Sequence, residues 1–370
     1  MPKRKHQSIR KLFSRSEKEW IDKQEPPIDG KLHRMPKKGK AEKTAGSPLK
    51  HSVVFMQDPQ GELHRYVYGK KLGEGHFARA NLAEDIDDGK RVAIKIAKLR
   101  TKEGILLSAP KRKEIKADVR KERKILERLG ELGAVLDRED KLLTAVLLFE
   151  NGIPLAKADL ECHSFGDRLI FAYQLLKKLE SIHQKDIIHI DISCNNVLIR
   201  KPHDATIIDF GLSEYAPSGR YKPKHKKERG TKSYIAPWVV EDGYSAASDI
   251  YSLGEVFGQD LFKGFYQHPD DKRHHKASEV LTAAEQKEWA KIEKMIQLMT
   301  GKKEEDIPSI QDCLKYFDPK RIADLKGPAE KPAILHQKKA KEDSEDDQEE
   351  EKKEKLEAVA TPSPKKRQRR

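Results

Sequence analysis

Cysteines, aromatic residues and long apolar runs are all scarce in this chain of 370 residues. The three cysteines, Cys162, Cys194 and Cys313, are too few for a disulfide framework and lack zinc-ligand spacing, so we expect a reducing compartment. No run approaches the roughly 18 apolar residues of a membrane-spanning helix, and we expect none. The first residues, Met1 to Lys5, include no apolar core segment, so a Sec-type signal peptide is not expected.

Charge is abundant but unevenly placed. The formal net charge is +14, and 37% of residues are charged. Residues 1–50 carry 15 Lys or Arg and 6 Asp or Glu, a net charge of +9, whereas residues 51–325 have a net charge of only +3. A balanced middle region argues against a strongly basic nucleic-acid-binding domain. Contact with nucleic acid is therefore expected only through the tails, if at all.

The two ends have the composition of charged, disordered tails. Residues 1–50 mix Lys, Pro and Gly with few apolar residues, and residues 326–370 contain an acidic block at 342–351. The chain ends in a basic cluster, 364–370, which is a candidate nuclear-import signal and equally a solvated tail. We therefore predict one folded domain over residues 51–325, between two disordered tails.

In the middle region, the predicted secondary structure changes from mainly strand to mainly helix near residue 150. Apolar segments at 52–56, 63–68, 91–96 and 142–149 predict strands, and the spacing at 114–132 predicts an amphipathic helix. Beyond residue 155, the pattern predicts helices near 169–182, 246–260 and 280–300, with two short strands at 196–199 and 206–208. A β-rich lobe at about 62–150 and a mainly α-helical lobe at 151–325 indicate a bilobal α+β fold, and 52–56 with 63–68 would add strands at its start.

A glycine-rich turn precedes a lysine in an apolar strand. Gly73 and Gly75 let the backbone approach phosphate oxygens, although an ordinary hairpin turn has the same pattern. Lys95 lies about 20 residues later within Val-Ala-Ile-Lys, where its charge needs a partner. Glu122 on the predicted helix is that partner, which would leave Lys95 able to reach a phosphate.

Four later segments resemble, in order, the motifs of eukaryotic-type protein kinases. Residues 187–198, Ile-Ile-His-Ile-Asp-Ile-Ser-Cys-Asn-Asn-Val-Leu, resemble the catalytic loop, and Asp209-Phe210-Gly211 resembles the metal-binding motif. Residues 230–237 resemble the end of an activation segment, and residues 248–254 resemble the helix that anchors the catalytic loop. The resemblance spans roughly 60–325.

The resemblance implies an ATP- and Mg²⁺-dependent phosphotransferase with a bilobal kinase-like fold. Asp191 would orient the substrate hydroxyl, Ser193 would stand where a lysine contacts the γ-phosphate, and Asn196 and Asp209 would hold Mg²⁺. Lys95 and Glu122 complete the catalytic set. The hinge would lie at 149–152, with Phe149 as gatekeeper. The residues implied for ATP binding are Gly73, Gly75, Ala80, Ala93, Lys95, Glu150 and Leu198.

Several positions depart from the family pattern. Ala78 replaces a third glycine. Ile190 replaces the arginine that usually pairs with a phosphate on the activation segment, so we expect activity without phosphorylation there. Ser193 is shared with atypical RIO-type kinases, but these lack the later motifs. Trp238 replaces a glutamate whose arginine partner is replaced by Ile307, so we expect these two apolar side chains to lie close together.

The motif around Thr231 resembles the serine/threonine type, so we expect a serine/threonine-protein kinase acting on protein hydroxyls. A basic activation segment, including Arg220, Lys222 and Arg229, would favour acidic protein substrates. A pseudokinase scaffold that binds nucleotide or partners without useful turnover is the alternative, supported by Ser193, Ala78 and Trp238. A nuclear factor acting through its tails is a third. Cytoplasm or nucleus is expected, and a bacterial effector inside a host cell fits equally. The oligomeric state is not predicted.

Overall fold

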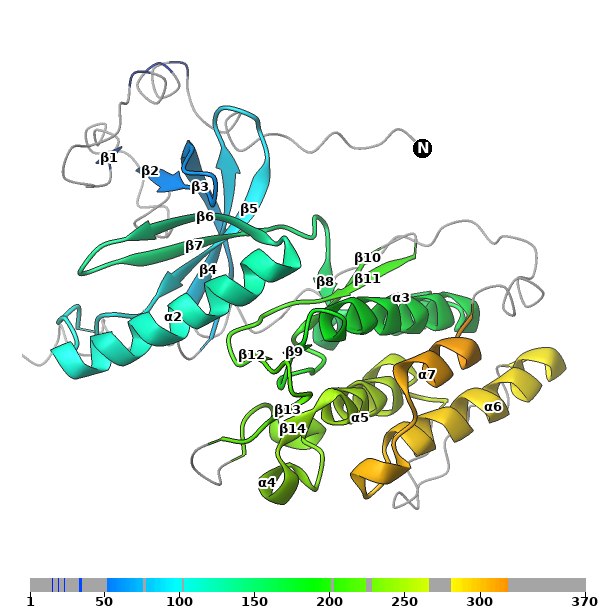
Figure 1. Ribbon diagram of the computed structural model, residues 1–370. Coiled ribbons are helices and arrows are strands. Elements are labelled where there is room, and N and C mark those ends of the chain that lie inside the picture. Colours follow the sequence, from blue (N-terminus) through cyan, green and yellow to red (C-terminus); the bar gives the residue numbers. More distant parts are fainter. Residues whose placement is uncertain are drawn as a thin grey trace, which may run out of the picture.

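The computed structural model describes 52–75, 78–101, 103–200, 203–223, 228–265 and 281–318, with a few single positions before residue 52. The chain forms a sheet-rich lobe and a helical lobe, the α+β architecture expected from the sequence (Figure 1). The tail at 326–370, with its basic cluster, lies outside the described residues, as does nearly all of 1–50.

The small lobe is an antiparallel sheet that closes on itself. Its strands run in the order β1-β2-β3-β4-β5-β7-β6, and Gln57 of β2 also pairs with Val135 of β6. Val54, Tyr68 and Ile94 belong to the apolar core of this sheet. The strands are β1 (His33–Arg34), β2 (Ser52–Gln57), β3 (Leu63–Glu74), β4 (Ala78–Asp85), β5 (Arg91–Ala97), β6 (Leu132–Asp137) and β7 (Leu142–Leu147).

The start of the sheet differs in part from the prediction. β2 is an additional strand, but 63–68 is not a separate one, because β3 runs from Leu63 to Glu74 and leads directly into the glycine turn. The sequence pattern also missed β6. This strand contains Gly133, where a Cβ would lie 3.3 Å from the carbonyl oxygen of Ala145, so the two strands approach each other closely there.

Helix α2 (Ala109–Leu129) packs along the sheet and reaches the other lobe (Figure 1). It begins five residues earlier than predicted, with proline in its first turn, and Gly130 ends it at a φ of 75°. Ile125 and Leu126 join the core of the large lobe. Arg123 is buried and donates to Thr144, Asp137 and the carbonyl of Leu143 in the sheet. The helix therefore connects the two lobes.

The large lobe is built on α3 (Phe165–His183), whose apolar residues recur every three or four positions and are fully buried. The other helices are α4 (Val239–Asp242), α5 (Ala246–Val256), a π-helical turn (Phe257–Leu261), α6 (Ala283–Met299) and α7 (Ile310–Tyr316), with short 3-10 turns at Leu155–Lys157, Leu160–Cys162, Lys232–Tyr234 and Glu304–Asp306. None of the described helices is long and apolar enough to cross a membrane.

Short strands carry the loops between the lobes. They are β8 (Ile153–Pro154), β9 (Ile187–Ile188), β10 (Val197–Arg200), β11 (Asp204–Ile207), β12 (Glu214–Tyr215), β13 (Arg220–Tyr221) and β14 (Tyr244–Ser245). β8, β10 and β11 form one small sheet, β9 pairs with β12, and β13 pairs with β14. These pairings hold both ends of residues 189–196 and of the segment that follows Asp209.

Candidate active site

Three charged side chains from different elements meet at the junction of the lobes. Lys95 Nζ on β5 lies 2.5 Å from Glu122 Oε1 on α2 and 2.7 Å from Asp209 Oδ1. Burial acts to lower the pKa of Lys95, but the charges of Glu122 and Asp209 outweigh it and raise that pKa above its usual range. Burial acts to raise the pKa of Asp209, and Lys95 outweighs it, so the pKa is lowered. The predicted lysine–glutamate pair is present in the structure.

The glycine turn lies at the edge of the sheet next to Lys95. Gly73 pairs with Ala80, and Ala80 pairs with Lys95, while the Gly75 carbonyl accepts from Lys98 Nζ at 2.8 Å. A Cβ at Gly73 would meet no atom within 4 Å, and one at Gly75 only the Ala78 carbonyl at 3.8 Å. Among the described residues, neither glycine of the turn is crowded, and residues 76–77 lie outside them.

The strand register shows which side chains share a face of the sheet with Lys95. Side chains paired across neighbouring strands share a face, so Ala80 and Lys95 lie on one side. Ala93 is two residues from Lys95 on the same strand and faces the same way. Val146 is paired with Ala93 and shares this face. Ala80 and Ala93 therefore lie where the sequence predicts an adenine cover, and Val146 extends that surface.

Phe149, the predicted gatekeeper, follows the end of β7 and lies in the turn before β8. Its ring lies under the guanidinium of Arg200, 4.2 Å from the ring centroid, and its carbonyl accepts from Gly152. A Cβ on Gly152 would lie 2.6 Å from Phe149 and 3.1 Å from Leu198. The gatekeeper role of Phe149 stays a prediction; Val146, on β7, is the residue that pairs with Ala93 and shares its face.

The hinge residue Glu150 and the floor residue Leu198 lie close to this turn. The Glu150 carbonyl accepts a hydrogen bond of 3.0 Å from Arg200, and Leu198 is paired with Pro154 and Thr206 in the small sheet. Arg200 therefore already uses the Glu150 carbonyl.

Asp191 is held by two side chains that approach its carboxylate from different segments. The Thr231 hydroxyl donates to Oδ1 at 2.7 Å, and the Asn196 amide nitrogen donates to Oδ2 at 3.1 Å. The same nitrogen donates to the Asp191 carbonyl at 2.9 Å. Since Asn196 donates through its nitrogen, its amide oxygen remains available as an acceptor or metal ligand.

Asp249 on α5 fixes the backbone of this loop. Its carboxylate accepts from the backbone N–H groups of His189 at 2.7 Å and Ile190 at 2.9 Å, and it is 1% exposed. Ile190 has a φ of 73°, unusual for a β-branched residue. A Cβ on Gly230 would lie 2.7 Å from the Ile190 carbonyl oxygen. Asp249 was not among the predicted site residues, although an aspartate inside an apolar helix signals a buried role.

His189 supports Asp191 from below. Burial lowers the pKa of His189, which favours the neutral imidazole. The ring accepts from the Asp191 N–H through Nδ1 at 3.3 Å and donates through Nε2 to the Ile208 carbonyl at 3.2 Å. One tautomer satisfies both contacts, so the ring links the loop to the strand before Asp209.

Ser193 and Trp238 are two positions at which the sequence departs from the kinase motif pattern. Ser193 is 1% exposed, and its hydroxyl has no hydrogen-bond partner among the described residues. Its predicted catalytic role therefore lacks an open path to substrate in this conformation. Trp238 packs edge-on against Tyr251, and Ile307 packs against the same apolar cluster. This confirms the predicted apolar replacement of the missing ion pair.

The donor set suits a hard divalent cation. Asn196 offers an amide oxygen and Asp209 a half-exposed carboxylate, the oxygen ligands that Mg²⁺ prefers. Asp209 has a φ of 68°, a strained backbone that aims its carboxylate toward Lys95. These two residues fit the metal implied by the sequence.

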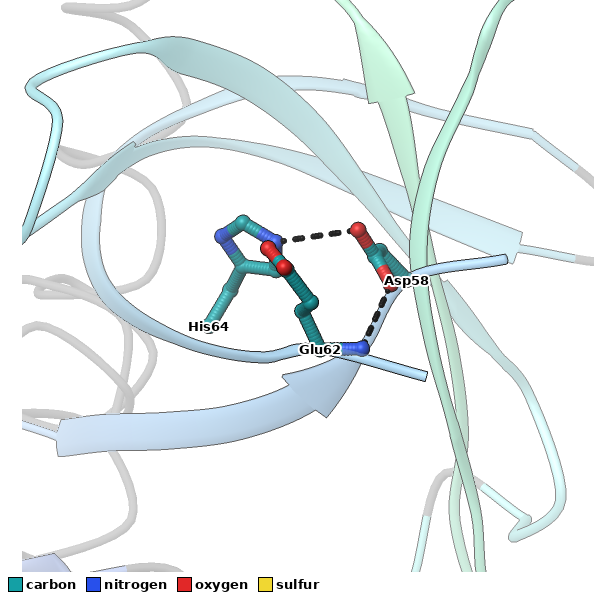
Figure 2. A group of neighbouring side chains, drawn as sticks. All are labelled: Asp58, Glu62 and His64. Carbon is teal, nitrogen blue, oxygen red and sulfur yellow. Dashed lines mark hydrogen bonds and ion pairs between the residues drawn. The ribbon is translucent and has the colours of Figure 1, made fainter. Parts of the chain in front are cut away.

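A second group of possible ligands lies on the β2–β3 hairpin, outside this site. Figure 2 shows His64 facing Asp58, with Glu62 beside them. His64 lies 2.6 Å from the buried Asp85 and 3.4 Å from Asp58, and Asp58 also accepts from the Glu62 N–H. Burial acts to lower the pKa of His64, but its contacts with Asp85 and Asp58 outweigh this and raise it. The group closes the hairpin as a charged clamp.

Comparison with known proteins agrees with this geometry. A family model for the protein kinase domain matches residues 66–330, more than half of the chain. The chain belongs to the protein kinase family. In this kinase, β2 precedes the matched span, yet it is hydrogen-bonded into the sheet.

The chain is also similar to curated kinases. It is 28% identical to mitogen-activated protein kinase kinase kinase 2 of Arabidopsis thaliana over 217 residues, 56% of this chain and 32% of that protein. It is 28% identical to CBL-interacting protein kinase 28 of Oryza sativa subsp. japonica over 207 residues, 54% and 46% of the two chains. With human 3-phosphoinositide-dependent protein kinase 1 it shares 28% identity over 246 residues, 64% and 41%. Each match spans less than half of the relative's length.

Proposed function

We propose that this chain is an active, ATP- and Mg²⁺-dependent serine/threonine-protein kinase. The observation that carries the proposal is the simultaneous presence of the Lys95–Glu122 and Lys95–Asp209 ion pairs with the Thr231–Asp191 hydrogen bond. Phosphoryl transfer needs mainly positioning and neutralisation of charge, and these contacts supply both.

Each residue has a definite task in this proposal. Lys95, oriented by Glu122, binds the phosphate chain that follows the turn at Gly73 and Gly75. Asp191 accepts a hydrogen bond from the substrate hydroxyl and orients its oxygen for in-line attack. Asn196 and Asp209 would hold Mg²⁺, which neutralises charge on the β- and γ-phosphates.

The preference for serine and threonine rests on Thr231. Its hydroxyl bonds directly to Asp191, as the sequence resemblance to serine/threonine kinases implies. The preference for acidic substrates has weaker support. Arg220 is paired with Glu304, and Arg229 is paired with Glu214, so these charges are used within the fold. Lys222 donates to the Glu241 carbonyl, and the remaining basic residues, 224 and 226–227, lie outside the described residues.

Activity independent of activation-segment phosphorylation is also proposed. Ile190 is 4% exposed and belongs to an apolar cluster with Ala236 and Trp238, so no cation is offered to a phosphate at this position. The location in cytoplasm or nucleus is a further proposal that rests on the basic cluster 364–370. A fluorescent fusion with and without 364–370 tests it, and equal nuclear signal in both would overturn the role of the cluster.

The function is tested by transfer of labelled phosphate from Mg²⁺–ATP to generic acidic and basic proteins and to the chain itself. Phosphoamino-acid analysis should give phosphoserine or phosphothreonine, and Asp191→Asn should abolish the label. Omission of Mg²⁺ or its removal by a chelator should do the same. ATP binding without label above the Asp191→Asn background would instead favour the pseudokinase scaffold.

A further inference from the structure

Glu214 connects the elements that carry the catalytic side chains. It lies on β12, where it is paired with Ile188 of β9, the residue just before His189. Its side chain is 14% exposed, so most of the carboxylate is shielded from solvent. A carboxylate in such a place requires compensating partners.

The two cations that compensate Glu214 come from opposite directions. Lys121 Nζ on α2 and Arg229 Nη1 in the activation segment each lie 2.8 Å from the same oxygen, Oε1. Lys121 is the neighbour of Glu122, which pairs with Lys95. Arg229 is two residues before Thr231, which bonds to Asp191. One carboxylate oxygen therefore links both halves of the active site.

Contacts next to Glu214 strengthen this link. The guanidinium of Arg128 on α2 lies 3.9 Å from the ring centroid of Tyr215. Helix α2 therefore contacts β12 through both Lys121 and Arg128, about two helical turns apart. Arg229 also donates to the Tyr221 hydroxyl and the Leu212 carbonyl, and its backbone is bonded to the Tyr244 hydroxyl. Arg229 is thus held rigidly, and Glu214 joins this rigid part to α2.

We propose that Glu214 is a positioning residue that holds α2 and the activation segment together in place of a phosphate. Resting on the kinase function proposed above, this assignment explains how a chain with Ile190 keeps its active arrangement. A phosphate would act by attracting cations from separate elements, and the Glu214 carboxylate attracts Lys121 and Arg229 permanently. The kinase is therefore built in an active state that requires no modifying enzyme.

The test compares Glu214→Gln and Glu214→Asp with a matched control, Glu304→Gln. Glu304 pairs with Arg220 in the same activation segment but contacts no residue of α2 in the structure described. Its side chain is similarly shielded, at 23% exposed. The control therefore removes an ion pair of the same segment without breaking the link to α2.

Glu214→Gln should lower kcat by about 10-fold or more and change KM for ATP by less than about 3-fold. The contacts of Lys95 and Asp191 would then be poorly positioned, and they act mainly on the transition state. Glu214→Asp should recover part of kcat, and Glu304→Gln should stay within about 2-fold of wild type. Glu214→Gln combined with Lys121→Gln should be no slower than Glu214→Gln alone. A wild-type kcat in Glu214→Gln, or equal losses in Glu214→Gln and Glu304→Gln, would overturn the proposal.

Hydrogen exchange separates this proposal from the kinase function itself. Absence of phosphotransfer in the wild type would contradict the function, yet the link can still be measured in that protein. Faster exchange in both α2 and residues 228–231 of Glu214→Gln than of Glu304→Gln supports the positioning role. Exchange that is equal in the two variants contradicts it.

Discussion

Around Asp191 the backbone is fixed by buried hydrogen bonds, whereas around Lys95 the side chains are fixed by ion pairs that reach solvent. Asp249 is 1% exposed and binds two backbone N–H groups, while Asp209 is 51% exposed and pairs with Lys95. Buried polar contacts are costly to break, and exposed ion pairs contribute little to folding. Changes around Asp191 should therefore affect both stability and activity, whereas changes around Lys95 should affect mainly activity.

The comparison is tested most strongly by Asp249→Ala. This change leaves the N–H groups of His189 and Ile190 buried without their acceptor, so unfolding should become easier by about 3–5 kcal/mol. Chemical denaturation measures this loss, and activity should disappear. Asp249→Asn keeps one acceptor oxygen, so its loss of stability should be smaller. Loss of activity in Asp249→Ala at unchanged stability would break the comparison.

Gly230→Ala tests the close approach to the strained Ile190. The new Cβ would lie 2.7 Å from the Ile190 carbonyl oxygen at a φ of 107°, so the expected loss is about 2 kcal/mol. Gly219→Ala is the control, because its φ is 77° but no atom lies within 4 Å of the new Cβ. Equal losses in the two variants would mean that the contact with Ile190 carries no strain.

Lys95→Met should show the opposite balance. Removing the cation should lower phosphotransfer by about 100-fold or more, because phosphate positioning is lost. The free energy of unfolding should fall by about 2 kcal/mol, because Asp209 becomes hydrated but Glu122, which is 12% exposed, loses the cation that compensates it. Lys178→Met, which breaks the comparable half-buried pair with Glu131 far from Asp209, should match this stability change and keep activity. A stability loss as large as that of Asp249→Ala contradicts the account.

The smallest effect is expected at the hairpin clamp, through pH. The folded state raises the pKa of His64, so its protonated form stabilises the fold below the ordinary value near 6.5. This stabilisation is lost as pH rises through the raised pKa. The free energy of unfolding of wild type should exceed that of His64→Gln by less than about 1 kcal/mol at pH 5.5, and this difference should shrink at pH 9. A difference that grows with pH would contradict the assigned direction.

The sequence was most informative where one residue type carries the chemistry in a fixed order. Lys95, Glu122, Asp191, Asn196 and Asp209 were all expected, and the structure joins the first two with Asp209 by ion pairs and Asp191 with Asn196 by hydrogen bonds. The two-lobe arrangement also followed from the change in apolar spacing near residue 150. Local patterns suffice for both inferences.

Features that depend on tertiary contacts were not visible in the pattern. The resemblance of residues 248–254 indicated the helix that anchors the catalytic loop, but not that Asp249 accepts from the N–H groups of His189 and Ile190. The role of Glu214 requires three distant segments to meet. The register of β5 and β7, which pairs Val146 with Ala93, also depends on tertiary contacts and was not predicted. A short strand with a glycine, β6, has too little alternation to be detected.

The most direct measurement is phosphotransfer by protein that has first been treated fully with phosphatase. The account predicts unchanged transfer to serine or threonine in the treated wild type, with none in treated Asp191→Asn. The ATP-binding affinity of both treated proteins should stay close to that of untreated wild type. Transfer that disappears on phosphatase treatment and returns after rephosphorylation would contradict the claim that this active site is assembled without a phosphate.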